Sequence, residues 1–302
     1  MFFILSGFLI YGTLIRKAHD YRKFMARRVE RIYPTFLVVL AIYLVLSFAV
    51  PSESKLPSDL TAAALLLANI LLLPGIFDIE AIITVAWSLS YEFFFYLTVP
   101  ALVAILGLRR WTPRSRIVLQ VVTIIATVWV SAYVKAPHLR MVYFVAGMMV
   151  FELVELKALT RVTSAALDVA TIGLFVASLV AVGARWLNGA FALGATLIAF
   201  MLLCVVSFRG YGVTYRWLTV SPLRWLGNMS YSYYLIHGLS LKALFFPMTS
   251  MLQRTGENAP VFWALLLPAF LSTLVPSAVL FLLVEKRWSL AAPVAKPATV
   301  TS

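Results

Sequence analysis

The chain has 302 residues, of which 62% are hydrophobic and 12% are charged, and its formal net charge at pH 7 is +13. A soluble globular domain has about 25% charged residues, so this composition excludes that class and indicates an integral membrane protein. The charge does not indicate nucleic-acid binding, because the basic residues lie in short segments between long apolar runs instead of on one solvated surface.

Ten apolar segments follow one another along the chain, and a membrane-spanning helix needs about 20 mostly apolar residues. The segments are residues 2–15, 33–50, 60–73, 85–106, 117–134, 141–154, 167–183, 189–208, 228–247 and 261–284. Only short polar gaps separate them, so we expect one all-α polytopic transmembrane bundle over residues 1–288. Residues 289–302, rich in Ala and Pro, are expected to form a disordered cytoplasmic tail.

The basic residues predict how the bundle is oriented. Residues 16–32 and 107–116 are rich in Arg and Lys, which collect in cytoplasmic loops. Three apolar segments lie between them, although an even number of crossings is needed to return to the same side. We therefore expect residues 60–73, which end at Pro74 and Gly75, to form a re-entrant or interfacial helix.

This topology gives nine crossings, a cytoplasmic C-terminus and an outer location for Met1. An additional upstream span would bring the start of the chain to the inner side. We therefore expect the sequence to lack the first transmembrane helix of its fold.

Glu92 is the clearest candidate for chemistry, because a carboxylate inside a span is expensive and is a functional candidate by default. It is expected one to two helical turns from the outer end of its helix, close to Trp87, Ser88 and Tyr91. It could act as a general base, orient a histidine or pair with a cation. A structural carboxylate bonded to a neighbouring helix is the alternative.

His237 lies inside the span of residues 228–247, where a histidine is either a packing residue or a catalyst. His19 and His138 are expected in loops, without a signal of their own. The single cysteine, Cys204, lies in an apolar run and is expected to be buried and inert. Because there is no Walker loop, dinucleotide-binding turn or His-Glu-x-x-His motif, we expect no metal and no permanently bound cofactor.

A basic cluster precedes the second span. If it is helical, Arg27 and Arg31 are i, i+4 neighbours and Arg28 lies to one side. Guanidinium groups can grip phosphates bidentately, which suits a nucleotide-bearing donor such as acyl-coenzyme A. Anchoring to anionic lipid at the cytoplasmic face accounts for the same placement equally well.

Five motifs occur in register along almost the whole chain. They are Phe-Phe-Ile-Leu-Ser-Gly-Phe-Leu-Ile at residues 2–10, Arg-Arg-Val-Glu-Arg-Ile-Tyr-Pro at 27–34, Trp-Ser-Leu-Ser-Tyr-Glu-Phe-Phe-Phe-Tyr at 87–96, Ser-Tyr-Ser-Tyr-Tyr-Leu-Ile-His at 230–237 and Leu-Val-Glu-Lys at 283–286. In order and spacing they resemble the acyltransferase-3 family of bacterial membrane O-acyltransferases.

The resemblance implies a multi-pass enzyme of the bacterial inner membrane that moves an acyl group, often acetyl, from cytoplasmic acyl-coenzyme A to a hydroxyl of a cell-surface glycan or similar acceptor. It implies that Arg27, Arg28 and Arg31 bind the donor and that Glu92 is the active-site carboxylate. We name His237 as a further catalytic candidate, although it corresponds to a position other than the family's catalytic histidine.

The sequence departs from the family pattern in two places. The histidine proposed as the family's catalytic base lies on a helix that precedes the Phe-Phe-x-x-Ser-Gly motif, and nothing here corresponds to it. Tyr91 replaces the acidic or small residue expected before Glu92. The alternative function is a polytopic transporter or flippase, which would predict related halves or paired broken helices, and the sequence shows neither.

Overall fold

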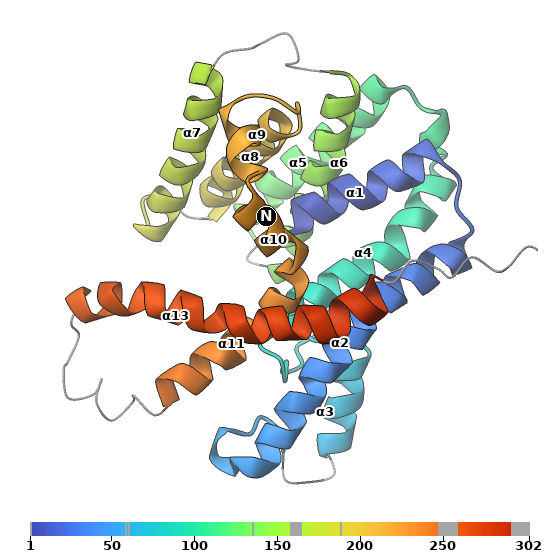
Figure 1. Ribbon diagram of the computed structural model, residues 1–302. Helices are drawn as coiled ribbons and strands as arrows, with labels where there is room; N and C mark the ends of the chain where they lie inside the picture. The colour runs from blue at the N-terminus through green and yellow to red at the C-terminus, as the bar shows by residue number, and fades with distance from the viewer. Residues whose placement is uncertain are drawn as a thin grey trace, which may run out of the picture. The chain divides into compact units, whose positions relative to one another are not determined.

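The computed structural model describes residues 2–57, 59, 61–134, 136–157, 165–187, 189–246 and 259–290. Among these residues the regular structure is helical, without β-strands (Figure 1). Seven of the described helices are long and apolar enough to cross a membrane. The candidate spans are Tyr21–Ala49, Ala86–Ile105, Pro113–Ser131, Pro137–Glu155, Ala165–Gly183, Gly189–Ser207 and Trp263–Ser289. The predicted fold class, an all-α polytopic protein, is confirmed.

Each of the ten predicted apolar segments contains a helix. The helices are α1(Phe2–Arg16), α2(Tyr21–Ala49), α3(Thr61–Ile70), α4(Ala86–Ile105), α5(Pro113–Ser131), α6(Val142–Glu155), α7(Ala165–Gly183), α8(Gly189–Ser207), α11(Ser230–Phe245) and α13(Ala259–Leu280). Shorter helical pieces connect some of them, namely η2(Leu108–Arg110), η3(Pro137–Met141), α9(Val213–Leu218) and α10(Ser221–Asn228).

Helix α3 has 10 residues, which corresponds to a rise of about 15 Å, half of the roughly 30 Å hydrocarbon core of a bilayer. It is too short to cross, as expected for the segment assigned as re-entrant or interfacial. Helices α1 and α11, with 15 and 16 residues, are near the lower length limit of a span. The count of nine crossings therefore stays a prediction.

Helix α2 begins earlier than the predicted span of residues 33–50. Its 29 residues include the whole basic segment from Tyr21 onward, and Pro34 lies inside it. Proline removes one backbone donor and usually bends a helix, but helices within membranes tolerate it. The conditional prediction that the arginine cluster is helical is thereby confirmed.

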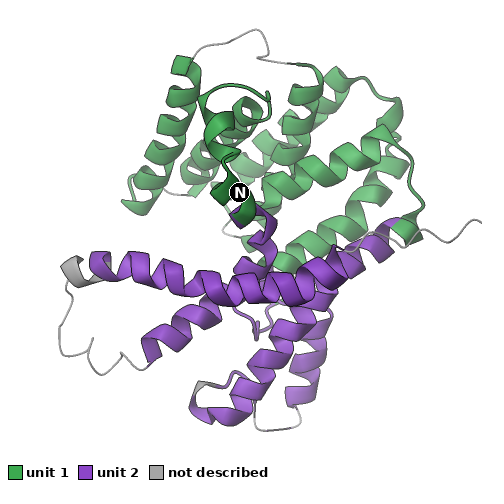
Figure 2. Ribbon diagram, in the orientation of Figure 1, with its two compact units in different colours: residues 1–23, 75–77, 88–225 green, residues 24–74, 78–87, 226–302 purple. Residues whose placement is uncertain are grey.

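The part of the chain that the structure describes forms two compact units (Figure 2). Unit 1 contains residues 1–23, 75–77 and 88–225, and unit 2 contains residues 24–74, 78–87 and 226–302. The prediction of one family domain over residues 1–288 stays a prediction. In the predicted tail, residues 291–302 lie outside the described residues.

The core of unit 1 depends on a close crossing of α1 and α6. A Cβ added at Gly7 would lie 2.2 Å from the carbonyl oxygen of Phe144. One added at Gly147 would lie 2.0 Å from the carbonyl oxygen of Ile4 and 2.8 Å from the backbone nitrogen of Phe8. Small residues let the backbones of membrane helices approach closely, and here only glycine fits.

A buried ion pair fixes one end of this crossing. The Glu152 side chain on α6 is fully buried, and its carboxylate accepts hydrogen bonds from Arg116 on α5 at 2.5 and 3.0 Å. The Tyr11 hydroxyl on α1 donates to the same carboxylate at 2.6 Å. The Glu152 carboxylate therefore joins α1, α5 and α6. Glu152 was not among the residues predicted from the sequence to be important.

Another buried carboxylate organises the cytoplasmic-side loop predicted after α8. Asp168 on α7 pairs with Arg209 and accepts the backbone N–H of Val213 at 2.5 Å. Gly212, with φ +99°, begins the short helix α9, and an added Cβ there would lie 2.3 Å from the Asp168 carboxylate. The carboxylate thus satisfies backbone donors at the start of α9.

In unit 2, α11 packs against α13, and the two helices lie side by side in Figure 1. Helix α13 continues as the π-helix η5(Phe281–Ser289). The Tyr231 hydroxyl on α11 donates to the backbone carbonyl of Ile32 at 2.8 Å, which joins α11 to α2.

Asn69, at the end of α3, fixes the segment that precedes α4. Its amide nitrogen donates to the carbonyl of Glu80 at 3.0 Å, and its carbonyl oxygen accepts the N–H of Ile82 at 2.9 Å.

At the start of α3, the hydroxyl and the backbone N–H of Thr61 both donate to the Asp59 carboxylate. These hydrogen bonds lower the pKa of that exposed carboxyl. The charged carboxylate favours the start of α3.

The glycine crossing gives a direct test. Gly147→Ala should lower the free energy of unfolding by about 2 kcal/mol or more, because the clash is with backbone atoms that cannot rotate away. Gly173→Ala on α7 is the matched control, since a Cβ there meets nothing within 4 Å. Thermal unfolding in detergent, followed by circular dichroism, measures both variants. Equal melting temperatures would contradict the close-crossing account.

Candidate active site

Glu92 is buried in unit 1, with 4% of its surface exposed, and lies less than two turns from the first residue of α4. The Ser6 hydroxyl on α1 donates to its Oε1 at 2.6 Å. The Tyr96 hydroxyl, one turn further along α4, donates to the same oxygen. A buried carboxylate is tolerated when hydroxyl donors replace its water, and Glu92 has two such donors.

This arrangement explains why two separate motifs belong together. Ser6 and Gly7 are adjacent in the Phe-Phe-x-x-Ser-Gly motif: the glycine brings the α1 backbone against α6, and the serine reaches Glu92. Tyr96 is placed by the i, i+4 spacing of α4. Glu92 was predicted to lie near Trp87, Ser88 and Tyr91, whereas its partners Ser6 and Tyr96 were not predicted.

Next to Glu92, the structure pairs Tyr91 with His138. The Tyr91 hydroxyl lies 3.0 Å from Nδ1 of His138 in η3, and the aromatic ring of Phe3 lies 6.0 Å from that of Tyr91. Successive helix residues point about 100° apart, so this pair occupies the face of α4 next to the Glu92 face. His138 was expected in a loop without a role. The one feature of the sequence that could have indicated this pair is Tyr91, which departs from the family pattern.

The three arginines of the basic cluster lie in unit 2. Arg27 is exposed, while Arg28 is half-buried with its guanidinium 5.2 Å from the ring centre of Phe24. Nη1 of Arg31 lies 3.0 Å from Oε1 of Glu285, at angles outside those of a hydrogen bond, so the contact is an ion pair. Its guanidinium also lies 5.9 Å from the ring centre of Tyr231. Arg31 is thus held in place by Glu285 and Tyr231, whereas Arg27 is open to solvent.

Glu285 is the residue that the sequence analysis missed here, although it lies in the closing Leu-Val-Glu-Lys motif. It is fully buried in the π-helix η5, and Oε2 accepts the N–H of Ser232 at 3.1 Å and its hydroxyl at 2.5 Å. A π-helical turn shifts the register of a helix and often occurs at functional sites. The last two family motifs therefore meet at the carboxylate that pairs with Arg31.

His237 lies in unit 2, whereas Glu92 lies in unit 1. Its Nδ1 bonds to the backbone carbonyl of Tyr234 at 2.8 Å, and its ring stacks on Tyr233 with centres 5.5 Å apart. Because a carbonyl only accepts, Nδ1 carries the proton and Nε2 is the basic nitrogen. The catalytic role of His237 stays a prediction.

No group of three or more His, Cys, Asp or Glu side chains suited to a metal ion occurs among the described residues. Cys204 is buried in the core of unit 1, with the neighbours Val150, Leu197 and Phe200.

Comparison with known proteins identifies the family. The family model of an acyltransferase domain, the acyltransferase-3 family, matches residues 1–282. The chain belongs to this family. It is therefore a multi-pass membrane acyltransferase that transfers groups other than aminoacyl groups.

Two relatives are informative. An uncharacterized protein of Haemophilus influenzae is 32% identical over 168 residues, covering 49% of this chain and 67% of that protein. The peptidoglycan O-acetyltransferase OatA of Listeria monocytogenes is 25% identical over 271 residues, covering 78% of this chain and 43% of that protein. The chain therefore matches less than half of the length of OatA. No solved structure is significantly similar to the chain.

The pair of Arg31 and Glu285 can be tested with a double-mutant cycle. Glu285→Gln keeps an oxygen for Ser232 but removes the charge, and Arg31→Met removes the other partner. Each single change should destabilise by about 3 kcal/mol, because it leaves a charge unpaired, and the double variant should lose less than the sum. Unfolding of the four proteins in detergent measures the coupling, and strictly additive losses would show that the two charges do not interact.

Proposed function

We propose that this acyltransferase moves an acetyl group from acetyl-coenzyme A on the cytoplasmic side of a bacterial inner membrane to a hydroxyl of a cell-surface glycan. The observation that carries the proposal is the buried Glu92 carboxylate, whose Oε1 accepts hydrogen bonds from Ser6 and Tyr96, hydroxyl groups of two separate motifs. The excess of basic residues in alternate loops supports a cytoplasmic C-terminus.

The chemistry assigned to Glu92 follows from its surroundings. In the reaction the acceptor hydroxyl attacks the thioester carbonyl carbon, the C–O bond forms, the C–S bond breaks, and the thiolate leaves. The hydroxyl proton must leave as the oxygen attacks. That proton passes either to the Glu92 carboxylate itself, acting as general base, or to a histidine base whose positive charge the buried carboxylate then stabilises without reorganising solvent. His237, with a basic Nε2, is the further candidate for proton transfer.

The arginines are assigned to the donor. Arg27 is solvent-exposed and can meet a phosphate directly, whereas Arg31 is oriented by Glu285 and Tyr231. Guanidinium groups bind phosphate oxygens in a bidentate manner, and coenzyme A carries several phosphates. The peptidoglycan acetyltransferase relative suggests a peptidoglycan fragment as the first acceptor to test.

Glu92→Gln should lower kcat by about 100-fold or more in proteoliposomes supplied with acetyl-coenzyme A and a glycan acceptor, because the variant keeps the shape but loses the charge. Ser6→Ala should cause a smaller loss, since Tyr96 still donates to the carboxylate. Glu155→Gln, which alters an exposed carboxylate paired with Arg16, is the control and should retain full activity. Wild-type turnover by Glu92→Gln would exclude Glu92 from the reaction.

Arg27→Gln should raise KM for acetyl-coenzyme A about tenfold with little change in kcat, because it removes one charge-assisted contact with the donor. Arg22→Gln, an exposed change in the first turn of the same helix, provides the comparison. If the cluster only anchors anionic lipid, both substitutions will leave KM unchanged and will instead lower the preference of the reconstituted protein for anionic over zwitterionic lipid.

A further inference from the structure

Two short helices, α9 and α10, follow α8 in the chain (Figure 1). With six and eight residues they rise about 9 and 12 Å, far less than the roughly 30 Å needed to cross the hydrocarbon core of a bilayer. We call residues 215–225 the α9–α10 segment. All of these residues belong to unit 1, and each of them is exposed.

The α9–α10 segment exposes large apolar side chains although it is no span. The exposed fraction is 70% for Trp217, 53% for Leu218 and 45% for Trp225. Indole rings are enriched at the boundary between a membrane and water, because each has an apolar body and one polar N–H group. The segment therefore has the side chains of a structure that lies along the surface of a bilayer.

Helix α10 is amphipathic. Successive helix residues point about 100° apart, which places Pro222, Leu223 and Trp225 on one side. Ser221 and Arg224 fall on the other side. An apolar face next to a basic face is typical of helices that lie in the interface between lipid headgroups and acyl chains.

The charge of the segment is positive. Residues 210–230 contain two arginines, Arg216 and Arg224, and no aspartate or glutamate. The carboxylate of Asp168, which accepts the N–H of Val213 at the start of α9, is paired with Arg209. That carboxylate therefore does not cancel the charge of the two exposed arginines.

Hydrogen bonds hold the turn between the two helices. The N–H and the hydroxyl of Thr219 donate to the carbonyl of Tyr215 at 3.0 and 2.8 Å, and the N–H of Arg224 donates to the carbonyl of Val220 at 3.0 Å. Backbone groups that already have partners inside the protein lose little when they leave water. The turn can therefore lie against lipid without a large desolvation cost.

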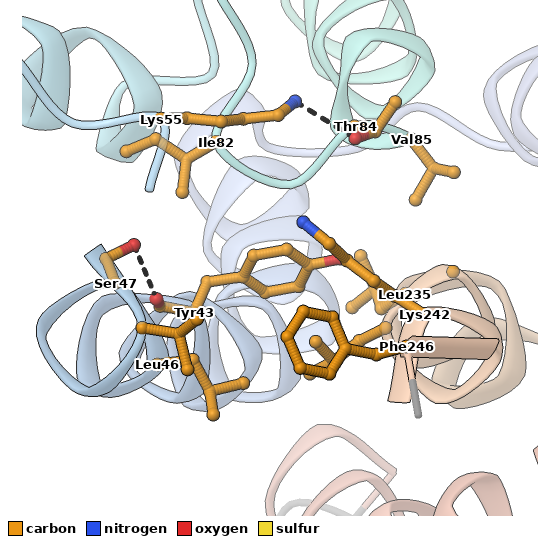
Figure 3. A pocket seen from close by; sticks show the side chains of 13 residues that line it. Tyr43, Leu46, Ser47, Lys55, Ile82, Thr84, Val85, Leu235, Lys242 and Phe246 are labelled. Atoms are coloured by element: carbon orange, nitrogen blue, oxygen red, sulfur yellow. Dashed lines mark hydrogen bonds between the residues drawn. The ribbon is translucent and has the colours of Figure 1, made fainter. Parts of the chain in front are cut away.

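The cavity of unit 2 offers a different environment (Figure 3). Nζ of Lys55, which lines it, donates to the Ala81 carbonyl at 2.9 Å and to the Thr84 hydroxyl at 3.0 Å. The Glu80 carboxylate lies 3.8 Å from the same nitrogen. The charge of Lys55 is thus engaged within the protein, and the cavity carries no comparable signal for an anionic ligand.

We propose that the α9–α10 segment binds the headgroups of anionic lipids at the surface of the membrane. The guanidinium groups of Arg216 and Arg224 would donate to the phosphate oxygens, while Trp217 and Trp225 would lie at the boundary with the acyl chains. The sequence-derived topology predicts this segment on the cytoplasmic side. The proposal concerns lipid binding alone and does not depend on acyl transfer.

The experiment uses the full chain in vesicles of phosphatidylcholine and phosphatidylglycerol, with bromine atoms on one lipid or the other. Brominated chains quench tryptophan on contact, and the difference between each protein and its Trp217→Phe variant isolates Trp217 among the eight tryptophans. Phosphatidylglycerol should be preferred at Trp217 by about tenfold or more, because each arginine near a charged surface contributes roughly fivefold. The double variant Arg216→Gln/Arg224→Gln should show almost no preference.

Trp186 is the matched control, since it lies in unit 1 and is 76% exposed. The lipid preference at Trp186, isolated with Trp186→Phe, should be the same with and without the two arginine changes. A preference at Trp217 that survives both arginine changes would overturn the proposal, as would equal association of the two lipids with the wild type.

Acrylamide, which quenches from water, distinguishes the other possible environments. Quenching of Trp217 by acrylamide but by neither brominated lipid would show that the segment lies in water, open to a soluble partner. Quenching by none of these reagents would show that protein covers the segment. Either result overturns the proposal.

Discussion

A charge that leaves water must find its partners inside the protein, and the described part of this structure is organised around that constraint. Four buried carboxylates show it: Glu92 is bonded to two hydroxyls, Glu152 to Arg116, Asp168 to Arg209 and Glu285 to Ser232 and Arg31. Each joins segments that are far apart in the sequence. The carboxylates therefore fix helix contacts that apolar packing alone would leave free to slide.

Arginine pairs with three of these carboxylates, Glu152, Asp168 and Glu285, and the hydroxyls of Ser6 and Tyr96 donate to Glu92. Hydrogen bonds from hydroxyl groups stabilise the charged form of a carboxylate. A buried charge held in this way can stabilise a proton or a cation during a reaction, which is the role that we propose for Glu92.

Much of the fold could be predicted from the sequence, because a bilayer permits few solutions. Apolar runs located all ten helical segments, and the short α3 matches the segment that the charge pattern required not to cross. The start of α2 was missed by twelve residues or so, since a charged segment can continue a membrane helix into the interface.

The site could be predicted only in part. Glu92 was identified from its location in a span, but its partner Ser6 depends on how α1 crosses α6, which the Gly7 and Gly147 contacts decide. Its other partner, Tyr96, follows from the i, i+4 spacing within α4. Glu285 was recognised as part of a motif, yet its pairing with Arg31 joins residues more than 250 positions apart. No local periodicity encodes such a contact.

We propose that the donor binds on the cytoplasmic side and that the acyl group is delivered on the outer side. Inverted membrane vesicles that contain the protein and an enclosed glycan, supplied with acetyl-labelled coenzyme A outside, test this most directly. We expect ester-linked label on the enclosed glycan and none on the same glycan added outside. Label on the external glycan alone, or no transfer to either, would contradict the account.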